Sequence, residues 1–298
     1  MDLLRLRAGR LAVDLAPHAG GSIARFAVEG ADGLVDLLRP TDIATLTNGR
    51  GNASSCYPLV PYSNRIADGR LIVDGRDIYM RPNWPGQRHP MHGDGWSRPW
   101  LVERANETDA DILYVHDRQG GWPFPYRARQ SFRLTEDALS IGISVQSGDP
   151  SPVPAGIGLH PFFVRDEDTT LSCRLSRVWL ADAEVLPTTR VDIPPRMDFS
   201  TPRKVSSVTL DNCFDGWDGR AVITWPSRRL RVDLEASPVF GHTVIYIPEG
   251  RPYFCVEPVS HANNGFALHA LGVEDVGYRL LANGDRLAGE VVFRVTME

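Results

Sequence analysis

The stretch "ALSIGISVQS", from Ala138 to Ser147, alternates apolar and polar side chains along most of its length. Successive side chains of a β-strand point to opposite faces, so this alternation predicts a strand with one buried and one wetter face. The apolar side chains are those of Leu139, Ile141, Ile143 and Val145. We therefore expect a half-buried strand here.

The two-residue period returns in "RLRVDLEA" (residues 229–236) and, less regularly, in "EVVFRVTM" (residues 290–297). No stretch of about 12 residues places apolar side chains at helical spacing. Turn-forming pairs separate the segments at short intervals. They are Asp32-Gly33, Asn48-Gly49, Asp74-Gly75, Asp218-Gly219 and Asn283-Gly284. This pattern predicts an all-β, antiparallel fold, either a sandwich or a barrel.

The length of 298 residues allows one large domain or two ordinary ones. No low-complexity linker divides the chain, and no repeat of about 20–50 residues is present. We expect a single domain over residues 1–298, with long loops between strands carrying the function.

The composition is that of a soluble globular protein, with 42% hydrophobic and 23% charged residues and a net charge of −5. The absence of a basic run excludes a nucleic-acid or anionic-membrane partner. No apolar run approaches the roughly 20 residues of a membrane helix, and the N-terminus has no secretory signal. The four cysteines form no CxxC pair, which favours buried free thiols. We expect a cytoplasmic protein.

Four stretches interrupt the strand pattern with polar residues. "YSNRIADGRL" contains Asn64 and Arg65, "HPMHGDGWSRPW" contains His92, "GIGLHPFFV" contains His160, and "YFCVEPVSH" contains Glu257. Burying an ionisable group without a partner is costly, so such groups usually have a partner or a function. His160 and Glu257 stand among apolar residues, which makes them the strongest candidates for a functional site.

A metal site is one interpretation of the histidines. His89 and His92 have the spacing of ligands on one helix face, and His160 and Glu257 would complete a cupin-like set. Pro90 and Gly93 disfavour a helix at this spacing, so nothing fixes a ligand geometry. No metal is predicted.

Five short motifs, in order along nearly the whole chain, resemble those of the aldose 1-epimerase (galactose mutarotase) family. They are "NRIADGR" (64–70), "HGDGWSRPW" (92–100), "GLHPFF" (158–163), "LDNCFDGW" (210–217) and "CVEP" (255–258). The segment "GGSIARFAVEGADGLVDLLRP" (20–40) also resembles the first hairpin of that family. The chain departs from the family at Asp94, where a second glycine is common, and we expect this position to border the site.

The resemblance implies a large antiparallel β-sandwich, the galactose mutarotase-like supersandwich, with a sugar bound across one sheet. It implies that Glu257 is the general base and His160 the general acid. It further implies that Arg65, His92 and Asp211 hold the sugar hydroxyls and that Asn64 supports Arg65. No metal or organic cofactor is expected, and the protein would act on a small sugar as a monomer or homodimer.

Interconversion of anomers suits these residue types. One proton leaves the C1 hydroxyl and another reaches the ring oxygen, from groups that we expect on opposite sides of the hemiacetal. A carboxylate in a partly apolar cleft has a pKa raised toward neutrality, and a histidine titrates near pH 7. Arginine offers a rigid fork of donors to neighbouring hydroxyls. Candidates for stacking on the sugar are Trp84, Trp96, Trp100 and Trp122, although we favour packing in the core for each of them.

Three other functions fit parts of the pattern. A hexose-6-phosphate 1-epimerase of the same superfamily would need extra cations, for which Arg70, Arg88 and Arg98 are the candidates. A non-catalytic carbohydrate-binding sandwich would not need both Glu257 and His160. A metal-dependent isomerase or hydrolase would need a stoichiometric metal.

Overall fold

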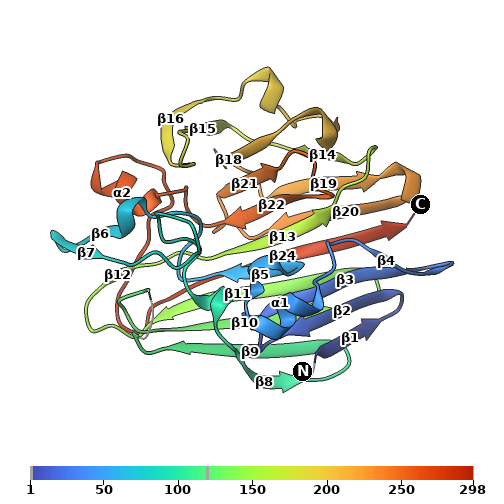
Figure 1. Cartoon of the computed structure of the whole chain (residues 1–298), viewed down its shortest axis with the longest axis horizontal. Helices are drawn as coiled ribbons and strands as arrows, with labels where there is room; N and C mark the ends of the chain where they lie inside the picture. Colours follow the sequence, from blue (N-terminus) through green and yellow to red (C-terminus); the bar gives the residue numbers. More distant parts are fainter. Residues whose placement is uncertain (1–2, 119–120, 298) are drawn as a thin grey trace.

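The computed structural model describes residues 3–118 and 121–297 and is built mainly from two large antiparallel sheets (Figure 1). The first has eleven strands. Their order is β1 (Leu4–Ala8), β2 (Leu11–Ala16), β3 (Ser22–Gly30), β5 (Cys56–Leu59), β13 (Gly158–Val164), β22 (Tyr253–Val259), β21 (His242–Ile247), β18 (Leu210–Asp215), β15 (Arg177–Ala181) and β16 (Pro187–Asp192), with β4 (Gly33–Asp36) paired to β3.

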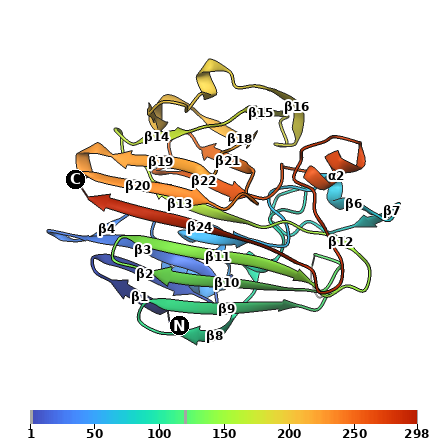
Figure 2. The ribbon, with the colours of Figure 1, turned by 180° about the vertical axis from the view of Figure 1, so that it is seen from behind.

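The second sheet has nine strands and is seen in front in the reverse view (Figure 2). Their order is β17 (Arg203–Lys204), β14 (Thr170–Cys173), β19 (Arg220–Trp225), β20 (Leu230–Ala236), β24 (Arg286–Met297), β11 (Ala138–Ser147), β10 (Tyr126–Leu134), β9 (Asp109–His116) and β8 (Leu101–Ala105). The quoted stretch is β11, and the other two alternating segments are β20 and the end of β24. The predicted all-β sandwich is confirmed.

Two small sheets, two short α-helices and six short 3-10 helices complete the regular structure of the described residues. The small sheets pair β6 (Arg70–Val73) with β7 (Arg76–Tyr79) and β12 (Val153–Pro154) with β23 (Leu280–Leu281). The α-helices are α1 (Ile43–Asn48) and α2 (Gly265–Ala270). The Asn48-Gly49 pair, expected between strands, instead ends α1, with Gly49 in the left-handed conformation at φ 71°. No helix in the described ranges is long and apolar enough to cross a membrane.

The space between the two sheets holds the larger hydrophobic core. Phe293 of β24 lies 6.2 Å from Phe26 of β3 and 6.1 Å from Phe163 of β13, measured between ring centroids. All three are fully buried. The four cysteines are free and buried, as expected. The single domain over residues 1–298 remains a prediction.

The alternation of β13 explains where the functional residues lie. Leu159 and Phe163 belong to the core between the sheets, whereas Phe162 belongs to a second cluster on the other face of the eleven-stranded sheet. His160 is two residues from Phe162 and shares its face. One face of this sheet therefore stabilises the fold, and the other carries the candidate site.

We expect Phe293→Ala to lower the free energy of unfolding by about 3–5 kcal/mol, because it removes a ring shared by both sheets. Leu101→Ala, at an exposed position of the edge strand β8, is the control and should change it by less than about 0.5 kcal/mol. Urea unfolding followed by circular dichroism measures both. Equal losses in the two variants would contradict the assigned core.

Candidate active site

Strand register brings His160 and Glu257 together on the exposed side of the eleven-stranded sheet. The flanking pairs Gly158–Val259 and Phe162–Cys255 place His160 on β13 opposite Glu257 on β22. Asp211 is on β18, where it pairs with Tyr246 of β21. Three residues that are far apart in the sequence thus share one face, because pairing and alternation act together.

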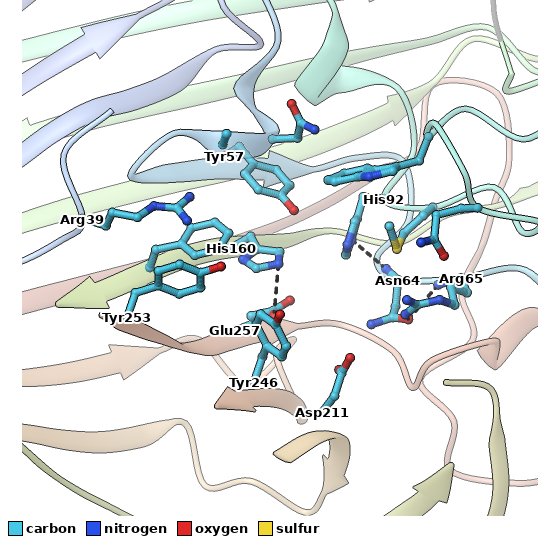
Figure 3. Close-up of a pocket in the computed structure, with 16 residues that line it drawn as sticks. Arg39, Tyr57, Asn64, Arg65, His92, His160, Asp211, Tyr246, Tyr253 and Glu257 are labelled. Atoms are coloured by element: carbon cyan, nitrogen blue, oxygen red, sulfur yellow. Dashed lines mark hydrogen bonds and ion pairs between the residues drawn. The ribbon is translucent and has the colours of Figure 1, made fainter. Parts of the chain in front are cut away.

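These side chains line a cavity of about 380 Å³, within the size range of small-molecule sites. All six residues expected at the site are among its walls: Asn64, Arg65, His92, His160, Asp211 and Glu257. Figure 3 shows His160 and Glu257 at its centre, with Arg65 and His92 to one side and Asp211 beyond Glu257.

His160 Nε2 lies 3.3 Å from Glu257 Oε1. Both side chains are almost fully buried, and His160 Nδ1 and Glu257 Oε2 have no hydrogen-bond partner within the described part of the chain. The two groups are side by side because they project from neighbouring strands of one sheet. Their placement on opposite sides of a bound hemiacetal remains a prediction. Burying polar atoms without hydrogen-bond partners costs free energy of folding, so these atoms indicate a binding site for a polar ligand.

Burial opposes charge on both members of the pair. It raises the pKa of Glu257 well above its ordinary value, and the nearby Asp211 carboxylate raises it further, against an opposing effect of Arg65. Burial, with the positive charge of Arg39, lowers the pKa of His160 to about 3. The pair is therefore set to hold one proton with no net charge.

The loop residues Asn64 and His92 are joined by two hydrogen bonds. The His92 N–H donates to the Asn64 carbonyl at 2.9 Å, and the Asn64 N–H donates to His92 Nδ1 at 3.0 Å. Both residues have a positive φ, 55° for Asn64 and 63° for His92, which is uncommon outside glycine. Burial lowers the pKa of His92 well below its usual value, so the ring is neutral and carries its hydrogen on Nε2.

Asn64 also orients Arg65. Its Oδ1 accepts hydrogen bonds from the Arg65 backbone N–H at 2.9 Å and from Arg65 Nη1 at 3.3 Å. Arg65 Nε is buried and has no partner among the described residues. The support of Arg65 by Asn64, implied by the family resemblance, has a geometric basis in these bonds.

A model of the aldose 1-epimerase family matches residues 2–294. The chain belongs to the aldose 1-epimerase family. A protein of uncharacterised function from Escherichia coli K12, YphB, is 30% identical over 270 residues, which cover 88% of this chain and 89% of YphB. A solved structure from the same organism, described provisionally as an aldose 1-epimerase, has a TM-score of 0.89 at 28% identity and covers 100% of this chain and 99% of its own.

A second Escherichia coli K12 protein, named aldose 1-epimerase, is 27% identical over 139 residues, which cover 45% of this chain and 38% of that enzyme. Membership of the epimerase family, the sandwich and the cavity thus agree with the resemblance carried by the five motifs.

Nine cavity residues of this epimerase-family chain were not expected from the sequence: Arg39, Asn52, Ala53, Tyr57, Gln87, Met91, Phe162, Tyr246 and Tyr253. Phe162 could have been found, since it lies in "GLHPFF" on the same face as His160. Tyr57 stacks on His160 with ring centroids 4.6 Å apart. Its position depends on the pairing of β5 with β13, and no local pattern reports that pairing.

Only one of the four candidate tryptophans lines the cavity. Trp84 does, and it lies 6.1 Å from His92 between ring centroids. Trp96, Trp100 and Trp122 are buried elsewhere. Trp96 and Trp100 donate their ring N–H groups to the carbonyls of Gly93 and Gly95, so they stabilise the His92 loop from within.

The expectation that Asp94 borders the site is wrong. Asp94 is buried, and its Oδ2 lies 2.7 Å from His116 Nδ1. Its carboxylate also accepts hydrogen bonds from the hydroxyl groups of Tyr114 and Tyr126. His116 Nε2 lies 2.9 Å from the Trp122 carbonyl oxygen. Asp94 therefore anchors the loop that presents His92 and does not meet a ligand in the cavity.

The histidines do not form the cupin-like set. His89 Nδ1 accepts the Asp68 N–H and His92 Nδ1 accepts the Asn64 N–H, and His89 is not in the cavity wall. His160, Cys255 and Glu257 do have donor atoms within 4.8 Å of one another. Burial raises the pKa of the Cys255 thiol well above its usual value, which disfavours the thiolate that a metal would need.

The Asp94–His116 pair should make stability depend on pH. Burial lowers the pKa of His116, but the hydrogen bond and charge of Asp94 outweigh burial and raise it above its usual value. The stabilisation is then fully present below the unfolded pKa of about 6.5 and is lost as pH rises through the folded pKa. We expect the destabilisation caused by His116→Gln, measured by urea unfolding, to be larger at pH 5.5 than at pH 9. A pH-independent difference would contradict a charged His116.

Proposed function

We propose that this protein is an aldose 1-epimerase that interconverts the α and β anomers of a free hexose or related aldose by opening and closing its ring. The observation that carries the proposal is the 3.3 Å separation of His160 Nε2 and Glu257 Oε1 at the centre of the cavity. The C1 hydroxyl and the ring oxygen are bonded to the same carbon, so two adjacent groups on one sheet face can serve both.

The proton count of the pair matches the reaction. In ring opening, the pair reacts from its charged form, in which the shared proton lies on His160 although burial favours it on Glu257. The Glu257 carboxylate takes the proton of the C1 hydroxyl while the His160 imidazolium gives a proton to the ring oxygen. The C1–ring-oxygen bond breaks, C1 becomes an aldehyde, and the pair becomes a carboxylic acid beside a neutral imidazole. Rotation about the C1–C2 bond and reversal of the two transfers give the other anomer.

The two states of the pair are equal in total charge, so no charge enters or leaves the cavity during the reaction. Burial favours the neutral acid and neutral imidazole, which is the form present when the ring is open. The pair thus stabilises the open-chain aldehyde more than water does. In water, solvent molecules would have to accept and donate the two protons.

The remaining residues hold the sugar. Arg65 offers donors that Asn64 orients, and neutral His92 offers its Nε2–H. Asp211 lies in the cavity wall, and burial raises its pKa. As a carboxylate it accepts hydrogen bonds from the sugar hydroxyls. These three supply donors and acceptors for vicinal hydroxyls, which is what a sugar requires and a purely apolar ligand does not.

A non-catalytic sugar-binding sandwich would explain the hydroxyl-binding residues but not the acid–base pair. Maintaining a carboxyl and an imidazole in contact, with unpartnered buried atoms, costs stability that binding alone does not require. The cytoplasmic location and the monomer or homodimer state remain predictions.

Glu257→Gln should reduce the enzymatic acceleration of mutarotation by about 10²–10⁴-fold, because an amide cannot accept the hydroxyl proton. Polarimetry of freshly dissolved α-D-glucose and α-D-galactose at neutral pH measures this. Glu249→Gln, an exposed change just beyond β21, is the matched control and should retain the native rate. Acceleration by the native protein that survives Glu257→Gln would remove Glu257 as the base.

His92→Asn should raise KM or lower kcat by about 10-fold while leaving the unfolding transition in place, because a donor to the sugar is lost or displaced. The same polarimetric assay, run over a range of sugar concentrations, separates the two constants. Unchanged kinetics would show that His92 only stabilises the loop.

A further inference from the structure

Arg39 is a rigidly held cation in the cavity wall that the proposed reaction does not use. Its backbone N–H donates to the Phe162 carbonyl at 2.7 Å, and its Nη2 donates to the Ser54 carbonyl at 3.0 Å. The guanidinium carbon lies 3.8 Å from the ring centroid of Phe162 and 4.4 Å from that of Tyr253. Two aromatic rings and a carbonyl therefore fix the fork of donors in one orientation.

No carboxylate forms an ion pair with Arg39 in residues 3–118 and 121–297. The arginines considered above for phosphate binding behave differently. Arg70 pairs with Asp77 at 2.8 Å, and Arg88 pairs with Asp68 at 2.8 Å and Glu184 at 3.2 Å. None of the three arginines Arg70, Arg88 and Arg98 lines the cavity. Arg39 does, and it can offer further N–H donors to a ligand.

The charges around the cavity do not balance for a neutral sugar. His160 and Glu257 together carry no net charge, and His92 is neutral. Among the other wall residues, Arg39 and Arg65 then face a single carboxylate, Asp211, whose pKa is itself raised by burial. Asp42 also interacts with the charge of Arg39, but it is exposed and lies outside the wall. The wall therefore carries at least one excess positive charge, which a ligand with one negative charge would neutralise.

We propose that Arg39 binds an anionic group, a carboxylate or a phosphate, on the exocyclic carbon of the sugar, so that the preferred substrate is an acidic aldose. This rests on the epimerase function proposed above and names its substrate class. A guanidinium fork matches both groups by two parallel hydrogen bonds, which gives it selectivity over a hydroxyl.

The position of Arg39 fits that substituent. Figure 3 shows Arg39 and Arg65 at opposite ends of the cavity, with His160 and Glu257 between them. The Phe162 ring stacks on His160 with centroids 4.5 Å apart, and the Arg39 guanidinium contacts the same ring. Arg39 therefore lies at the end of the cavity that is next to His160. His160 serves the ring oxygen, and the exocyclic carbon of a hexose is attached to the ring carbon next to that oxygen. Arg65 is left for the hydroxyls at the far end.

An anion on Arg39 would also assist the acid. The positive charge of Arg39 opposes the imidazolium form of His160. A bound carboxylate or phosphate offsets that charge, and His160 then holds its proton more readily before passing it to the ring oxygen. A neutral sugar leaves the opposing charge uncompensated.

Exchange NMR at anomeric equilibrium tests the proposal without pure anomers. The rate is measured for D-glucose, D-glucuronate and D-glucose 6-phosphate with the native protein, Arg39→Gln and Arg39→Lys. We expect at least one anionic sugar to exceed glucose in kcat/KM by about 10-fold or more, since charge-assisted bidentate bonds are about twice as strong as neutral ones. Which anion is preferred separates carboxylate from phosphate recognition.

The ratio of anionic to neutral kcat/KM is the measure of Arg39. It should fall about 10-fold in Arg39→Gln and less in Arg39→Lys, which keeps the charge without the fork. Arg88→Gln, an arginine outside the cavity, is the matched control and should keep the native ratio. A native preference for glucose, or a ratio that Arg39→Gln leaves unchanged, would overturn the proposal while leaving the epimerase function in place.

Calorimetric titration with the same three sugars measures their affinities. It therefore identifies the class of ligand even if the protein interconverts the anomers of none of them. Tighter binding of an anionic sugar that is lost in Arg39→Gln, without exchange of any sugar, would overturn the epimerase function and retain the assignment of Arg39. Equal binding of all three sugars would reject that assignment.

Discussion

The antiparallel pairing of β13 with β22 is the constraint on which the site depends. One face of these strands packs into the core between the sheets, through Phe163 and Phe254, whereas His160 and Glu257 project from the other. A shift of one residue in either strand would move an ionisable side chain into that core and an aromatic ring out of it. The burial that stabilises the sandwich therefore also fixes the distance between the acid and the base.

The loops around the cavity depend on a second set of buried contacts. His92 and Asn64 keep uncommon backbone conformations because their mutual hydrogen bonds hold them, and the tryptophans and Asp94 hold the following loop from beneath. Strain of this kind persists only where the surroundings over-determine it. The site thus combines a rigid floor made by strands with loop residues that the interior of the protein immobilises.

Alternation was enough to predict β11, β20 and the end of β24, because strand side chains report burial with a period of two. Together with the turn-forming pairs and the lack of helical spacing, it indicated the all-β class. The six candidate site residues came from short motifs, and all six line one cavity. Local patterns could not reveal Tyr57 or Arg39, whose places depend on which strands are neighbours. Tyr253, like Phe162, could have been found, since it shares a strand face with Glu257. Asp94 was misjudged for a related reason: a charged residue in a loop looks the same in sequence whether it faces a ligand or supports the loop.

The charges that surround the acid–base pair act differently on its two members. Arg39 opposes the charged form of His160, whereas Asp211 opposes and Arg65 favours the charged form of Glu257. Burial fixes the pair at one proton, but these neighbours decide which member holds it. A ligand group that meets Arg39 or Arg65 therefore changes the position of that proton as well as the affinity of the sugar. In a cleft with so few charges, recognition of the substrate and the readiness of the acid and base for proton transfer are set by the same side chains.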